Sequence, residues 1–232
     1  MMKLNKYKIS GFLLLLIFLL ILILSLGIGL QQFRSMRFSY PNLLGDLLIS
    51  GLRVTLITII TWLVSIFAAH VFSKNESVKS VFMPVVNFIR HISPFAWLPF
   101  AIIWFGLGEQ SLIFIMFIAL FFPTLIGCIS IYDEINRDYI DEGNVCGANK
   151  WQIFFYIELP LSLPALINLF RIIWGLGWST IIAAEMLGVK SGLGFRLLDF
   201  RYLLKYPEML IYLTVMGIFG VGVDSLLRRI VN

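Results

Sequence analysis

Long apolar runs constrain the fold of this chain more than any other feature of its sequence. Six runs have about the 20 residues that a helix needs to cross a hydrocarbon core roughly 30 Å thick. They cover residues 9–30, 47–72, 81–105, 111–131, about 159–187 and about 209–230. Six transmembrane helices place both ends of the chain on the same side of the membrane.

Composition agrees with a polytopic membrane protein. Hydrophobic residues make up 59% of the chain and charged residues 13%, against roughly half and a quarter in soluble domains. The 232 residues leave little chain for a soluble domain. We therefore expect one all-α membrane domain, with an N-terminal helix and outer loop in residues 1–45 and a core in residues 46–232.

The first run is predicted to be a retained helix, because it is too long for a signal peptide and lacks a small-residue cleavage site. Lysine and arginine counts then favour cytoplasmic termini, with nine residues on that side and six on the other. The nine are Lys3, Lys6, Lys8, Lys74, Lys79, Arg137, Lys150, Arg228 and Arg229. The six are Arg34, Arg37, Lys190, Arg196, Arg201 and Lys205.

A polar insert at about residues 133–158 interrupts the apolar pattern on the cytoplasmic side. Residues from Tyr139 to about Phe155 suit one short amphipathic helix. Its expected apolar face carries Ile140, Val145, Ala148 and Trp151. Such a helix can enter a groove on another protein or rest on lipid headgroups, and amphipathicity alone leaves both open.

The spacing of residues in this insert resembles a known motif. Asp141-Glu142-Gly143 is followed by Gly147, Ile157 and Leu159-Pro160, at the intervals of the pattern E-A-A-x3-G-x9-I-x-L-P. This is the EAA loop of permease subunits in binding-protein-dependent ABC importers. Asp141 stands where glutamate is usual, and Glu142-Gly143 replace two alanines. The resemblance implies a coupling helix that docks into an ATPase subunit through Asp141, Glu142, Gly143, Gly147, Ala148, Trp151, Ile157, Leu159 and Pro160.

Further segments look like the nitrate, sulfonate and taurine branch of these permeases. They are residues 93–99, 103–109, 183–188 and 191–194, and the resemblance runs from about residue 81 to 229. Residues 1–80 match only as generic membrane helices. Permeases of this branch also serve thiamine precursors, riboflavin and aromatic acids, so the branch leaves open a nitrate-like or taurine-like anion, a vitamin or a vitamin precursor.

The resemblance implies a type I ABC importer permease in the bacterial cytoplasmic membrane. It implies a core of two permease copies, two ATPase chains and an extracytoplasmic binding protein. The chain contains no Gly-Lys dipeptide and hence no Walker A loop, so ATP and Mg²⁺ are expected on the partner ATPase. We expect no enzymatic activity, cofactor, metal or nucleic acid on this chain. The alternatives are a secondary transporter or channel and a membrane-embedded enzyme.

Prolines single out the third run as a candidate for the wall of the transport pathway. Pro94 and Pro99 flank Trp97, and each proline removes a backbone donor. In lipid, a broken helix survives only where protein or a water-filled cavity satisfies its backbone. The alternative is a kinked packing helix without ligand contact.

Two charged residues in the fifth run are further pathway candidates. Arg171 and Glu185 are fourteen residues apart, or about 21 Å along a helix, and cannot pair directly. We assign Arg171 to the inner pathway and Glu185, with Met186, to the outer cavity or gate. Pairing with neighbouring helices is the alternative for both charges.

The remaining polar residues are interpreted by their position along the sequence. Arg53 and Arg90 are expected near an interface, with side chains that reach the headgroups. His70 and His91 are isolated, which disfavours a metal site or proton relay. Cys128 and Cys146 have no histidine nearby and are interpreted as structural thiols.

A basic outer segment follows the fifth run. Lys190, Arg196, Arg201 and Lys205 lie within one expected loop. A positive rim of this kind can concentrate an anionic cargo or meet acidic patches on a binding protein, and we favour the second role.

Overall fold

The computed structural model describes residues 43–73, 76–186 and 188–231, and every regular element within these ranges is helical. Four helices there are long and apolar enough to cross a membrane, or five if one bent pair of helices is counted as a single span. The predicted all-α membrane fold is therefore confirmed. The predicted first span at residues 9–30 and the outer loop after it lie outside the described residues.

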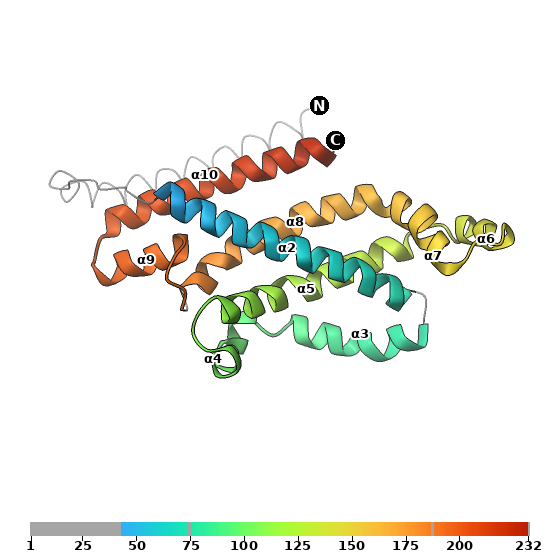
Figure 1. Ribbon diagram of the computed structural model, residues 1–232, viewed down its shortest axis with the longest axis horizontal. Helices are drawn as coiled ribbons and strands as arrows, with labels where there is room; N and C mark the ends of the chain where they lie inside the picture. Colours follow the sequence, from blue (N-terminus) through green and yellow to red (C-terminus); the bar gives the residue numbers. More distant parts are fainter. Residues whose placement is uncertain (1–42, 74–75, 187, 232) are drawn as a thin grey trace, which may run out of the picture.

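Three helices form the centre of the bundle (Figure 1): α2 (Leu43–Ser73), α5 (Glu109–Asp133) and α8 (Leu159–Glu185). Gly177 of α8 lets them pack closely. A Cβ atom added there would lie 3.3 Å from side-chain atoms of Val54 and Thr58 on α2 and of Leu120 on α5. Small residues commonly permit such close approach of helices in membranes.

Two outer helices complete the bundle. Helix α10 (Tyr206–Val231) packs against α8, and the short helix α9 (Leu193–Tyr202) packs against both. The basic outer segment, expected to be a loop, is thus largely helical. Figure 1 shows α9 at one end of the molecule and α6 with α7 at the other.

The third span is broken rather than continuous, as Pro94 and Pro99 predicted. It consists of α3 (Glu76–Arg90), a 3₁₀ helix η1 (Pro94–Trp97) and α4 (Leu98–Phe105), with a bend of 90°. Ser93 has an extended ψ of 130°, as expected for a residue that precedes proline. Pro94 and Pro99 lie in the first turns of η1 and α4, where a missing N–H costs least.

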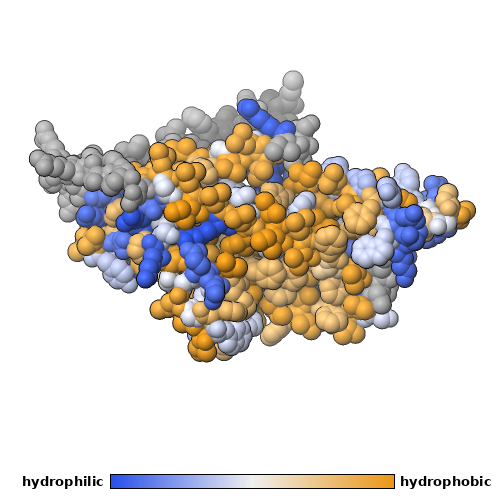
Figure 2. Space-filling model, in the orientation of Figure 1, coloured by the Kyte–Doolittle hydropathy of each residue, from blue (hydrophilic) through white to orange (hydrophobic). Residues whose placement is uncertain are grey.

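Polar residues gather toward the two ends of the long axis (Figure 2), and a broad hydrophobic belt separates them on the face shown. Two residue clusters therefore lie at opposite ends of the spans: one around α6 and α7, and one where α2, α5, α8 and α9 meet.

Candidate functional site

The polar insert forms a helical projection, which we call the coupling region, at residues 137–158. It consists of α6 (Arg137–Val145), α7 (Lys150–Ile153) and a π-helical turn η2 (Phe154–Glu158) that continues into α8. The prediction of a single helix from Tyr139 to Phe155 is wrong, because the chain breaks at residues 146–149.

Local sequence explains this break. Gly147 adopts a φ of +78°, which favours glycine, and its N–H donates to Asn144 O at 3.0 Å. The N–H of Ala148 donates to Gly143 O at 3.0 Å. These two hydrogen bonds form a Schellman motif, which ends α6. Asn149 and Gln152 then form a reciprocal capping box that starts α7.

Gly143 lets α6 pack against the following helix. A Cβ atom at this position would lie 2.7 Å from Ile157 Cδ1, so any larger residue requires Ile157 to move. Gly143 and Ile157 therefore hold the two arms of the coupling region together. Leu159 and Pro160 occupy the first turn of α8, where proline is tolerated.

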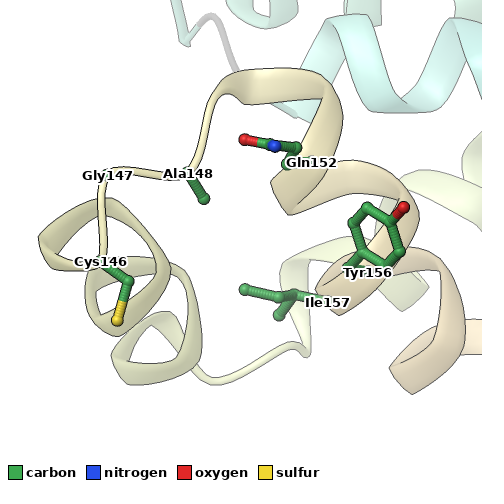
Figure 3. Close-up of a pocket in the computed structure, with 6 residues that line it drawn as sticks. All are labelled: Cys146, Gly147, Ala148, Gln152, Tyr156 and Ile157. Carbon is green, nitrogen blue, oxygen red and sulfur yellow. The ribbon is translucent and has the colours of Figure 1, made fainter.

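Exposed apolar side chains cover the outside of the coupling region. Val145 is 89% exposed, Trp151 62% and Tyr156 79%. A pocket of about 320 Å³ opens beside them (Figure 3), lined by Cys146, Gly147, Ala148, Gln152, Tyr156 and Ile157. Asp141 and Glu142 are exposed on α6. A surface of this kind, with apolar groups around a depression and charges beside them, suits another protein.

Sequence reasoning missed a buried polar pair behind this surface. His70, in the last turn of α2, has its Nδ1 atom 2.8 Å from Oε2 of Glu158, the last residue of η2. The signal was present, since Glu158 is a lone carboxylate in an apolar stretch and such groups need a partner. His91, in contrast, is exposed after α3.

The opposite end of the bundle contains a second buried polar cluster, which we call the outer network. Glu185 is fully buried and accepts hydrogen bonds from Ser50 Oγ and Arg53 Nη1, each at 2.8 Å. Arg53 also pairs with Glu109 and donates to Ser191 O at 2.8 Å. Glu185 thus makes the pairing with neighbouring elements that was the alternative to a pathway role. Arg53 is largely buried and paired, so its predicted headgroup position is wrong.

The glycines that follow Glu185 make room for its carboxylate. Gly192 has a φ of +105°, and a Cβ atom there would lie 2.5 Å from Glu185 Cδ. The N–H of Gly194 donates to Glu185 Oε2 at 2.9 Å. Two segments that the sequence singled out separately, residues 183–188 and 191–194, therefore build one buried site.

The other pathway candidates are dispersed. Arg171 Nε donates to Asp224 Oδ1 on α10 at 2.7 Å, which joins α8 to α10. Trp97 is half-buried in η1, and Met186 is half-buried after Glu185. Arg90 is exposed at the end of α3. The contacts of these residues within the described ranges do not unite them in a single cavity, and their predicted pathway role stays a prediction.

No group of three metal-binding side chains occurs within the described ranges. Cys128 is buried on α5, whereas Cys146 is exposed in the coupling region.

A membrane-spanning helical bundle with a short helical projection at one end is the architecture of an ABC importer permease. The fold matches the inward-facing MetNI methionine ABC transporter with a TM-score of 0.71, covering 84% of this chain and 98% of that one at 21% identity. The chain belongs to the family of binding-protein-dependent transport system inner membrane components, which matches residues 61–232. The predicted type I fold and family are confirmed. Members of this family are transport subunits, not enzymes.

Named relatives lie in the branch that the sequence indicated. The taurine transport system permease protein TauC of Escherichia coli (strain K12) is 30% identical over 160 residues, or 67% of this chain and 58% of TauC. The nitrate import permease protein NrtB of Synechocystis sp. (strain ATCC 27184 / PCC 6803 / Kazusa) is 35% identical over 61% of this chain and 51% of NrtB. The chain thus spans less than two thirds of the length of these two relatives.

Proposed function

We propose that this chain is the permease subunit of an ATP-driven importer and that the coupling region docks into a separate ATPase chain. The exposed apolar surface around Trp151 carries the proposal, because it lies at the end of the spans on a projection stiffened by helix caps. In water, an apolar patch of this kind favours a protein partner.

The partner assembly follows from the family. We propose two ATPase chains, which bind ATP and Mg²⁺, a second copy of this permease and an extracytoplasmic binding protein. The coupling region and both termini then face the cytoplasm. The positions of Lys79, Arg137 and Lys150 near the coupling-region end support this orientation.

The proposed cargo is a small solute with an anionic group. TauC is named for taurine, NrtB for nitrate, and the relative CmpB of Synechocystis sp. (strain ATCC 27184 / PCC 6803 / Kazusa) for bicarbonate. All three solutes carry a negatively charged group. The exposed residues Lys190, Arg201 and Lys205 at the opposite end from the coupling region are compatible with such a cargo.

Uptake into proteoliposomes tests the proposed activity. The chain is reconstituted with its ATPase and binding protein, and labelled taurine, nitrate and bicarbonate are offered with and without ATP. We expect uptake of at least one solute that requires ATP and the binding protein. Uptake driven by an ion gradient without ATP would instead identify a secondary transporter.

Substitution of Trp151 tests the docking surface. Trp151→Glu places a charge in an apolar contact, so we expect ATPase binding and coupled hydrolysis to fall by roughly tenfold or more, the range for interface hot spots. Trp151→Phe keeps the apolar contact and serves as the control. The measurement is pull-down of the ATPase by membrane-inserted permease, and normal binding by Trp151→Glu contradicts the assignment.

A further inference from the structure

The His70–Glu158 pair joins the coupling region to α2, one of the three central helices of the bundle. Glu158 ends η2 and directly precedes α8, whereas His70 belongs to α2. Their polar atoms are 2.8 Å apart, and the residues are 9% and 6% exposed. A buried carboxylate that has lost its solvent requires such a partner. The pair is therefore a close, buried contact between these elements rather than a surface ion pair.

Aromatic rings connect this pair with the proposed docking surface. The His70 ring lies 4.1 Å from the Phe154 ring and 6.4 Å from the Trp151 ring, measured between centroids. Phe154 is fully buried and also contacts Phe67 of α2, at 5.9 Å. A docked protein that displaces Trp151 would therefore push on the packed rings of Phe154 and His70, and through them on α2. Close-packed interiors transmit such displacements because they have few voids.

Helix α2 extends from this contact to the outer network. Arg53 lies seventeen residues before His70, which corresponds to about 25 Å along the helix. Between them, Trp62 Nε1 donates to Leu166 O of α8 at 3.0 Å, and Trp174 Nε1 of α8 donates to Thr55 Oγ1 at 3.1 Å. Helices α2 and α8 are thus linked by polar contacts at both ends and along their length.

We propose that His70 and Glu158 are positioning residues that make α2 follow the movement of the coupling region, so that ATPase docking at one end reaches the outer network at the other. This inference rests on the proposed function. It assigns a role to a contact that lies outside the residues of the EAA pattern, since Glu158 occupies a position where that pattern accepts any residue.

Hydrogen–deuterium exchange of the permease–ATPase complex tests the proposal without knowledge of the cargo. Exchange is compared with and without a non-hydrolysable ATP analogue. In the wild type we expect the analogue to change exchange in residues 137–158 and at the end of α2, residues 65–73. With Glu158→Gln, the change in the coupling region should persist and the change in α2 should be lost. The ratio of ATP hydrolysis by the complex to hydrolysis by the ATPase alone should differ roughly fivefold or more between Glu158→Gln and the wild type.

A double substitution separates positioning from simple stability. Replacing a buried polar pair by apolar residues often restores or improves stability. We expect Glu158→Gln to lower thermal stability, and His70→Leu with Glu158→Leu to recover that stability but not the response of α2. Lys79→Gln, which breaks the exposed 2.5 Å pair between Lys79 and Asp133 on the same membrane side, is the control and should respond as the wild type.

Two results would overturn the inference in different ways. If Glu158→Gln or the double variant shows the wild-type response in α2, the pair does not position α2. If the wild-type coupling region itself does not respond to the analogue although the complex forms, the proposed docking surface is wrong, and the proposed function with it.

Discussion

At the scale of single residues, Glu185 shows how a charge is kept inside an apolar span. A charge at the centre of a membrane helix costs at least about 2.5 kcal/mol on insertion scales. Here Ser50, Arg53 and the N–H of Gly194 surround the carboxylate, so the charge is matched within the subunit. Its partners come from α2 and from the start of α9, which the sequence separates by more than a hundred residues.

Gly192→Ala is expected to destabilise the protein. The φ of +105° is strained for alanine, and the new Cβ atom would displace the Glu185 carboxylate. We expect a loss of roughly 1–3 kcal/mol, the usual cost of a residue held in a rare backbone conformation. Thermal unfolding in detergent measures it. Gly217→Ala is the control, because a Cβ atom there has open space, and an equal loss in both variants would contradict the argument.

At the scale of elements, turns decide where helices stop. Hydropathy merges α3 with α4 and α6 with α7, because the residues on both sides of each break have similar character. Pro94 and Gly147 mark the breaks, but proline and glycine also occur inside unbroken helices here, as Pro84, Pro123 and Gly177 do. The hydrogen bonds of the Schellman motif and the capping box distinguish the second break.

The exposed end of α9 is expected to dock the binding protein. Arg201 and Lys205 are exposed, whereas Arg196 Nε already donates to Asp46 Oδ2 at 3.0 Å. The double reversal Arg201→Glu with Lys205→Glu should weaken docking, and wild-type docking should weaken with salt, because exposed charges are screened beyond about 8 Å.

A binding assay on immobilised permease at several salt concentrations measures this docking. Arg196→Gln is the matched variant and should lower thermal stability rather than docking, because it removes an internal pair. If the double reversal leaves both the affinity and its salt dependence unchanged, the basic residues are headgroup anchors instead.

At the scale of the whole molecule, the polar groups form two clusters at opposite ends of the bundle. The coupling region and the His70–Glu158 pair lie at one end, and the outer network lies at the other. Helices α2 and α8 run from one cluster to the other.

The isolated chain is expected neither to bind nor to hydrolyse ATP. It has no Gly-Lys dipeptide, and hence no Walker A loop to hold the phosphates. Titration calorimetry with Mg-ATP on the purified chain, and then on the complex with its ATPase, measures the difference. Micromolar binding by the chain alone would contradict this expectation.

Sequence alone determined the membrane class, four of the spans, the family and the position of the coupling region. Apolar run length and motif spacing are local along the chain, so they can be read without a structure. Tertiary structure alone decided which charges are matched and which are exposed. Glu185, Arg171 and Glu158 look alike in sequence, as lone charges in apolar stretches. Their partners lie on other helices, at sequence separations that no local pattern encodes, and only the packing of the bundle brings Arg53, Asp224 and His70 to them.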